Sequence, residues 1–185
     1  MLAFWAAVTA LGDLRFWLLV LLFIGVYAAL ERRKLSPHAK RALRVLLCTL
    51  IVGALTAQAL KMVVDAPRVC VPCPAQDCNP YCPPDDPYAS PSGHAALSFA
   101  MFTAAWLAFP KNNRQRARWV WVFILPVLVS ASRVALAVHT PVQVAAGSLL
   151  GIFVAALAWR ILKGDGRRFL KRIGFVWTTV CFLRF

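Results

Sequence analysis

Acidic side chains are scarce in this chain, and histidines are fewer still. The 185 residues include 7 Asp and Glu against 21 Lys and Arg, which gives a formal net charge of +14, together with 3 His. Four of the seven acids fall between residues 63 and 90. An excess of cations of this size suggests nucleic acid as a partner. The distribution of the cations along the chain distinguishes a nucleic-acid-binding protein from a membrane protein.

The cations gather in short clusters between apolar runs. Such clusters are typical of cytoplasmic loops in membrane proteins, so we do not expect a nucleic-acid partner. Sixteen of the 21 cations belong to three clusters: Arg32, Arg33, Lys34, Lys40, Arg41 and Arg44; Lys111, Arg114, Arg116 and Arg118; and Arg160, Lys163, Arg167, Arg168, Lys171 and Arg172.

The chain also has no internal repeat, no low-complexity tract and no recognisable cleavable signal peptide. Its first apolar stretch lacks a basic start and is followed by a charged loop, so we expect a retained membrane anchor. We expect a single domain over residues 1–185 and no strand of any length.

Apolar residues make up 61% of the sequence, and runs of nearly twenty recur. The bilayer is therefore the expected solvent, and we predict an all-α integral membrane bundle of five or six spans. Residues 1–12 are too short to span and are expected to form an interfacial helix that ends at a break at Gly12-Asp13. The C-terminal segment 169–185 is either a short sixth span or a surface helix. The five predicted spans are residues 14–30, 43–62, 92–109, 119–131 (with a possible extension to 138) and 142–162.

The positive-inside rule predicts which side each loop occupies. With the three basic clusters inside, the polar loop at residues 63–90 lies outside. The same orientation places five polar residues of interest on the outer face, although the rule does not use them. These residues are Lys61, Arg68, His94, Arg133 and His139.

The segment from Ser90 to His94 reads Ser-Pro-Ser-Gly-His and precedes an apolar run. Proline suits the first turn of a helix, and serine is a good N-cap. The free N–H groups of a helix N-terminus bind anions, and Gly93 lets a ligand approach the backbone. Taken alone, the segment is equally readable as a capped helix with an incidental histidine.

A second group follows in the next span. Arg133 lies within an apolar run, where a charge is costly and usually functional, and its guanidinium suits phosphate oxygens. His139 lies six residues later. If Pro141 begins a helix, Gln143 can accept a hydrogen bond from the N–H of one ring nitrogen of His139 and leave the other nitrogen as a nucleophile. The alternative is an arginine that reaches the lipid headgroups and a histidine in a loop.

Lys61 and Arg68 are seven residues apart, close to two helical turns. Pro67 indicates that the helix ends before Arg68. By themselves these are an ordinary pair of cations at a membrane edge. Together with two imidazoles and Arg133, they supply the nucleophile, proton donor and fixed charge that phosphoryl transfer requires.

The ordered set Lys61-x6-Arg68, Pro91-Ser92-Gly93-His94 and Ser132-Arg133-x5-His139 resembles the type 2 phosphatidic acid phosphatase (PAP2) superfamily. The resemblance implies a metal-independent membrane lipid phosphatase without a cofactor. It implies that His139 is the nucleophile that becomes phosphohistidine and that His94 protonates the leaving oxygen. The implied phosphate ligands are Lys61, Arg68, Ser92, Gly93 and Arg133.

Two positions depart from the family pattern. The first motif usually reads Arg-Pro, whereas here Pro67 precedes Arg68 and Val69 follows it. The last motif usually carries Asp four residues after the nucleophilic histidine, whereas this chain has Gln143. An amide accepts a hydrogen bond but adds no charge. Gln143 resembles the branch of dolichyl diphosphate phosphatases and glucose-6-phosphatases, so it is interpreted as a mark of that branch; the alternative is a slow or inactive enzyme.

Four cysteines crowd the predicted outer loop: Cys70, Cys73, Cys78 and Cys82. The outer side of a membrane is oxidising, so two disulfides are favoured over a zinc site or free thiols. Four cysteines allow three pairings, and the spacing does not choose among them.

The resemblance and the predicted topology together imply a phosphatase at the outer face of a bacterial inner membrane. The expected substrate is a lipid diphosphate, undecaprenyl diphosphate above all. The alternatives are lipid A, phosphatidylglycerol phosphate and phosphatidic acid, or transfer of the phosphoryl group to another lipid. A non-enzymatic lipid-phosphate binder or small transporter is the competing class.

Overall fold

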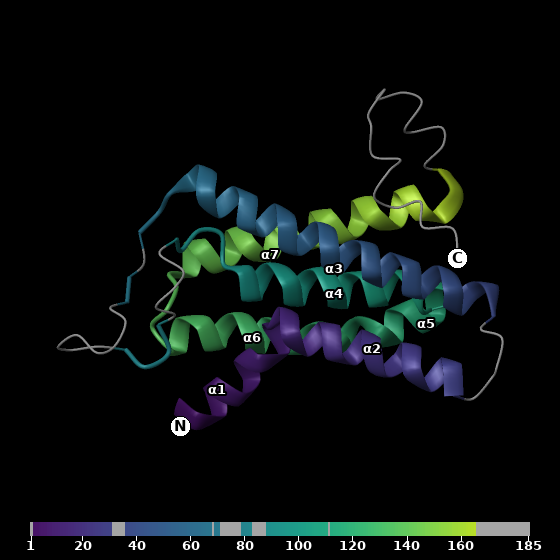
Figure 1. Cartoon of the computed structure of the whole chain (residues 1–185), viewed down its shortest axis with the longest axis horizontal. Helices are drawn as coiled ribbons and strands as arrows, with labels where there is room; N and C mark the ends of the chain where they lie inside the picture. Colours follow the sequence, from purple (N-terminus) through teal and green to yellow (C-terminus); the bar gives the residue numbers. More distant parts are fainter. Residues whose placement is uncertain are drawn as a thin grey trace.

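The computed structural model describes residues 2–30, 36–67, 69–70, 79–82, 88–110 and 112–165. Every regular element in these ranges is helical, apart from one isolated bridge between Pro67 and Tyr88 (Figure 1). The prediction of an all-α membrane bundle is therefore confirmed. The predicted C-terminal segment 169–185 lies outside the described residues.

The N-terminal helices are broken at the predicted point. Helices α1 (Leu2–Thr9) and η1 (Ala10–Gly12) are followed by α2 (Leu14–Leu30), and the chain bends by 57° at the break. Asp13 has extended backbone and caps α2, because its Oδ1 accepts a hydrogen bond from the Arg15 N–H at 2.7 Å. Helix α1 packs against α6.

Helix α3 (Pro37–Val64) extends the predicted second span at both ends. It begins with Pro37 behind an N-cap, where Ser36 Oγ accepts from the Ala39 N–H at 3.2 Å. It ends at Asp65, which has a left-handed φ of 46°.

Helices α4 (Gly93–Ala108) and α7 (Pro141–Arg160, continued by the π-turn Ile161–Asp165) form the centre of the bundle (Figure 1). Two glycines of α7 set their separation. A Cβ on Gly147 would collide with the carbonyl oxygen of Ser92, and one on Gly151 with that of Ala96. Glycine spacing of this kind lets two membrane helices bring their backbones together.

The fourth predicted span is formed by η2 (Trp119–Phe123) and α6 (Ile124–Ala135). Helix α5 (Asn113–Arg118) precedes it and occupies most of the basic segment that was expected to be a turn. Among the described residues, three stretches are long and apolar enough to cross a bilayer, namely Pro37–Val64, Asn113–Ala135 and Pro141–Lys163. The bent pair of α1 and α2 makes a fourth if it is counted as one span. Helix α4 is apolar but shorter.

The bundle has two chemically different ends. The described members of the basic clusters lie at the start of α3, along α5 and at the end of α7, which meet at one end in Figure 1. A contact of 3.2 Å between His38 Nε2 and the Phe109 carbonyl joins the start of α3 to the end of α4. The end of α3 and the starts of α4 and α7 lie at the opposite end, and these helix ends carry Lys61, Gly93 and Gln143.

Candidate active site

Lys61 reaches the start of α4 from the last turn of α3. The loop between these helices is closed by a hydrogen bond from the Ala89 N–H to the Ala66 carbonyl at 2.9 Å. Lys61 is only 7% exposed, and its Cε and Nζ lie 3.9 Å from the position that a Cβ on Gly93 would occupy. The first predicted cation therefore lies directly against the Ser-Gly-His segment.

The Ser-Gly-His segment forms a helix N-terminus, as predicted. Gly93 is the first residue of α4 and Ser92 is its N-cap, whereas Pro91 precedes the helix and is not in its first turn, contrary to expectation. The Ser92 hydroxyl makes no capping bond, and this fully buried oxygen has no hydrogen-bond partner among the described residues. The first N–H groups of α4 point out of the helix end without intrahelical acceptors.

His139 is fixed by the start of α7. Pro141 is the first residue of this helix, and Thr140 and Gln143 form a capping box. Gln143 Oε1 accepts from the Thr140 N–H at 3.0 Å and lies 3.3 Å from His139 Nδ1. The predicted contact between His139 and Gln143 is therefore present.

The Thr140 N–H fixes which ring nitrogen of His139 carries the proton. A backbone N–H can only donate, so the Gln143 atom that faces it is the carbonyl oxygen. The same oxygen then requires a donor at Nδ1 of His139. Nε2 is then the unprotonated ring nitrogen of His139, a residue that is 4% exposed.

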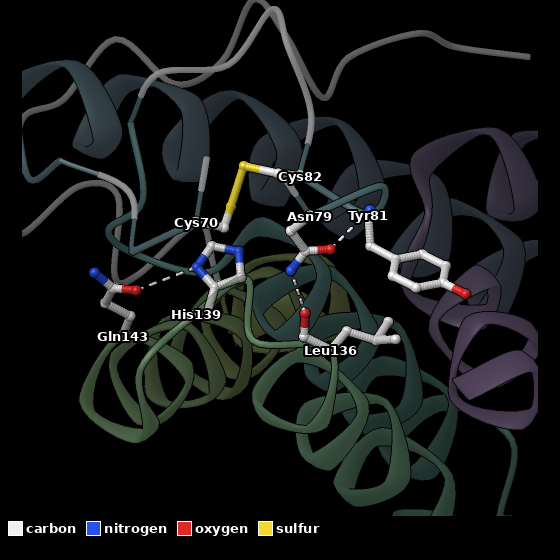
Figure 2. The surroundings of a disulfide bond; sticks show 7 residues. All are labelled: Cys70, Asn79, Tyr81, Cys82, Leu136, His139 and Gln143. Carbon is white, nitrogen blue, oxygen red and sulfur yellow. Dashed lines mark hydrogen bonds between the residues drawn. A yellow bond between two sulfur atoms is a disulfide. The ribbon is translucent and has the colours of Figure 1, made fainter. Parts of the chain in front are cut away.

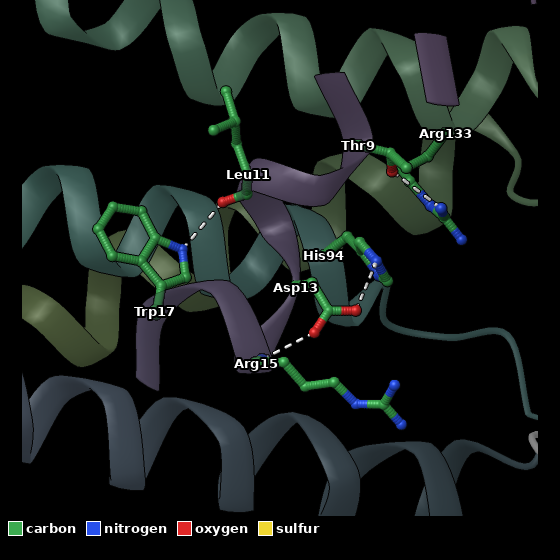
Figure 3. A network of polar contacts seen from close by, with 7 residues as sticks. All are labelled: Thr9, Leu11, Asp13, Arg15, Trp17, His94 and Arg133. Atoms are coloured by element: carbon green, nitrogen blue, oxygen red, sulfur yellow. Dashed lines mark hydrogen bonds and ion pairs between the residues drawn. The ribbon is translucent and has the colours of Figure 1, made fainter. Parts of the chain in front are cut away.

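Arg133 supports His139 through its backbone and contributes a second cation. Its carbonyl oxygen accepts from the N–H groups of Val138 and His139 at 3.2 and 3.3 Å. Its side chain is 5% exposed, and Nη1 donates to Thr9 Oγ1 at 2.9 Å (Figure 3). A guanidinium at the end of α6 is thus held by a residue of α1.

One backbone bond joins the two histidine motifs. The Ser92 N–H donates to the carbonyl oxygen of Gln143 at 3.0 Å, so the first turn of α7 contacts the N-cap of α4. Together with the contacts described above, this bond links residues carried by or next to four helices: Lys61, Ser92, Gly93, Arg133 and His139. Arg68, the remaining predicted phosphate ligand, lies outside the described residues.

Asp13 is a site residue that the sequence reasoning missed. His94 Nε2 lies 3.9 Å from Asp13 Oδ2, and the two side chains are 29% and 43% exposed (Figure 3). We interpreted Asp13 only as part of a helix break. An acid between two apolar runs is costly in a membrane protein and usually functional, and this cost could have indicated a site residue from the sequence.

A cavity of about 220 Å³ lies beside this pair. Its polar lining includes Lys61, His94 and Asp13, and its apolar lining includes the small α3 residues Ala54 and Ala57, which precede Lys61 by seven and four positions. This volume accommodates a phosphoryl group and the first atoms of an apolar chain. Within the described ranges, no three His, Cys, Asp or Glu side chains gather as a metal site.

The loop before α4 is tied down by a disulfide and an asparagine (Figure 2). Cys70 and Cys82 form a disulfide, which confirms a disulfide in this loop and shows which cysteines it joins. The other two cysteines of the loop, Cys73 and Cys78, lie outside the described residues. Asn79 Nδ2 donates to the Leu136 carbonyl at 2.7 Å, three residues before His139. The loop is therefore anchored to the turn that carries His139.

Comparison with known proteins agrees with the motifs. Residues 41–167 match the PAP2 superfamily. An undecaprenyl-diphosphatase from Sulfolobus acidocaldarius is 40% identical over 76 residues, which cover 40% of this chain and 34% of the relative, so the match spans about a third of that protein's length. No solved structure matches. Because the family match covers more than two thirds of the sequence, the chain belongs to the PAP2 superfamily.

Proposed function

We propose that the protein is a PAP2-type lipid phosphatase that hydrolyses a polyprenyl diphosphate, with undecaprenyl diphosphate as the main candidate. The observation that carries the proposal is the contact between His139 Nδ1 and Gln143 Oε1, beside the N-terminus of α4. This contact assigns the ring proton to Nδ1 and makes Nε2 the nitrogen that attacks phosphorus, next to a helix end that binds anions.

The first step transfers the phosphoryl group to the protein. Nε2 of His139 attacks the terminal phosphorus and forms a P–N bond, while the P–O bond from this phosphorus to the bridging oxygen breaks, and His94 gives a proton to that oxygen as the lipid monophosphate departs. Lys61 and Arg133 offset the charge on the non-bridging oxygens. In the second step, water attacks phosphorus, His94 takes a proton from the water, and the P–N bond breaks to release phosphate and regenerate His139.

The cavity supports a lipid substrate. Its charged lining residues suit a phosphate, and the small apolar residues of α3 that also line it suit the first carbons of a lipid chain. The named relative is an undecaprenyl-diphosphatase, which supports a polyprenyl chain. We further propose that this end of the bundle faces the outside of a bacterial inner membrane, because the basic clusters lie at the other end.

The test is phosphate release from a panel of lipids by the purified protein in detergent, with excess EDTA. Undecaprenyl diphosphate is expected to give the highest kcat/KM, ahead of lipid A, phosphatidylglycerol phosphate and phosphatidic acid. His139→Ala is expected to abolish release while retaining lipid binding. The matched control is His38→Gln at the opposite end, which keeps a side-chain hydrogen-bonding group near Phe109 and is expected to retain full activity.

Two results would contradict the proposal. Unchanged release by His139→Ala would exclude the phosphohistidine route, and lipid binding without any release by the wild type would identify a lipid-phosphate binder. A higher kcat/KM for another lipid would reassign the substrate. Recovery of the phosphate on a second lipid would reassign the reaction to transfer between lipids.

Lys61 offers an independent check of phosphate binding. Lys61→Met is expected to raise KM by about 10- to 100-fold, since a charge-assisted hydrogen bond to the substrate is lost. Lys40→Met, on the first turn of the same helix at the basic end, is the matched control and is expected to leave KM unchanged. Equal effects of the two variants would show that Lys61 acts through general charge alone.

A further inference from the structure

The N-terminal segment from Thr9 to Asp13 contacts the site from outside the family match. The match to the PAP2 superfamily begins at residue 41, whereas the segment ends at residue 13. Thr9 Oγ1 accepts a hydrogen bond from Arg133, and Asp13 lies beside His94 (Figure 3). Two residues of the proposed mechanism are thus contacted by a part of the chain that the family motifs do not include.

Gly12 explains how the segment comes so close to His94. A Cβ at this position would lie 2.9 Å from the His94 carbonyl oxygen and 2.7 Å from Val129 Cγ1, so only glycine fits without a shift. Glycine therefore permits close approach of the two backbones, and the next residue, Asp13, projects into the same cavity as His94.

We infer that Asp13 and Thr9 are positioning residues of the active site: Asp13 stabilises the protonated ring of His94, and Thr9 orients the guanidinium of Arg133. This inference rests on the proposed function. The contact of 3.9 Å between Asp13 Oδ2 and His94 Nε2 is too long for a hydrogen bond. The carboxylate therefore acts on the ring through its charge.

The charges around His94 make this role specific. The cations of the site are Lys61 from α3, Arg133 from α6 and Arg15 from the first turn of α2. The phosphohistidine form of His139 is a further titratable group. Each cation opposes a positive charge on His94, whereas Asp13 is the acid of the cavity wall. Both chemical steps benefit from it, because His94 is an imidazolium before the first step and again after it takes the proton from water.

Asp13→Asn separates charge from structure. Asparagine caps helices as well as aspartate does and offers the same oxygen to the Arg15 N–H, so α2 keeps its start. The alkaline limb of the kcat/KM profile is expected to move to lower pH by about half to one unit, because the imidazolium loses a partly exposed counter-charge. KM is expected to stay the same or fall, since the variant also removes a carboxylate that repels phosphate.

The matched control is Asp65→Asn, which removes an exposed acid at the same end of the bundle. Asp65 has left-handed backbone, a conformation that asparagine tolerates, and the substitution keeps the bond of 3.1 Å from the Asp65 N–H to the Lys61 carbonyl oxygen. Asp65→Asn is expected to keep the wild-type pH profile, and Asp13→Glu is expected to restore part of the alkaline limb. Asp13→Ser, which also caps α2, replaces the asparagine variant if that variant does not fold.

An unchanged pH profile in Asp13→Asn and Asp13→Ser overturns the inference for Asp13, as does an equal shift in Asp65→Asn. Failure of the proposed function is recognised separately, because the wild type would then release no phosphate at any pH. A wild type that is active through His139, with unshifted Asp13 variants, refutes the inference and leaves the proposed function standing.

Thr9 is tested by a change that preserves shape. Thr9→Val removes the hydroxyl that accepts from Arg133 and is expected to raise KM by about two- to tenfold with little change in kcat. Thr9→Ser keeps the hydroxyl and is expected to retain the wild-type KM. A valine variant with wild-type KM, or a serine variant as impaired as valine, would show that Thr9 does not act through Arg133.

Discussion

The contact between α4 and α7 differs in kind from the contact that the N-terminal segment makes with the same site. Gly147 and Gly151 bring the backbones of α7 and α4 together. This helix pair holds His139 and the Ser-Gly-His segment at its N-terminal ends. Thr9 and Asp13 instead act through side chains, and Asp13 is 43% exposed. The positions of the reacting groups thus depend on the packing of α4 against α7, whereas the negative charge beside His94 comes from a partly exposed segment.

The largest expected effect comes from separating helices α4 and α7. Gly151→Leu would force a side chain into the carbonyl of Ala96, which is expected to destabilise the fold by about 3 kcal/mol or more and to abolish phosphate release. Gly25→Leu on α2 is the control, because no atom lies within 4 Å of its added Cβ. Thermal unfolding and phosphate release measure both variants, and equal stability of the two would show that the close approach is not required.

The next effect concerns Gln143, which belongs to both helix and site. Gln143→Ala removes the acceptor at His139 Nδ1 and half of the capping box, so kcat is expected to fall by about 10- to 100-fold with a smaller change in KM. Gln143→Glu keeps an acceptor oxygen and is expected to lose less. Steady-state kinetics decide the point, and an alanine variant with wild-type kcat would remove Gln143 from the mechanism.

The smallest expected effect on catalysis is that of the disulfide. Cys70 and Cys82 stiffen the loop beside His139 without touching the phosphate site described above, so replacing both with serine is expected to lower stability by about 2–4 kcal/mol and change kcat by less than about threefold. Cys48→Ala on α3 is the control. Unfolding with and without reductant tests this, and a reductant-insensitive wild type would contradict a stabilising role.

Much of the helical scaffold was predictable because its signals are local. Apolar length predicted the helices, and the Gly12–Asp13 break lies where the helices bend. The His139–Gln143 contact followed from helical spacing after Pro141. In each case the interacting residues are only a few positions apart along the chain, so periodicity and capping rules apply directly.

The missed features depend on contacts between distant parts of the chain. Thr9 and Arg133 are 124 residues apart, and no sequence period relates them. Asp13 was interpreted only as part of a helix break, because the sequence does not show that it lies beside His94, 81 residues further along the chain. The close packing at Gly151 likewise depends on which helix lies opposite, which hydrophobic patterning does not specify.

The central claim is that Nε2 of His139 becomes phosphorylated, and the most direct measurement is a single turnover with lipid diphosphate labelled in its terminal phosphate. The reaction is quenched in base, which preserves phosphohistidine, and the labelled peptide is identified by mass spectrometry. The account predicts an acid-labile phosphate on His139 that is absent from His139→Ala and present in Asp13→Asn. Release of phosphate with no label on the protein, or with the label on another residue, would contradict it.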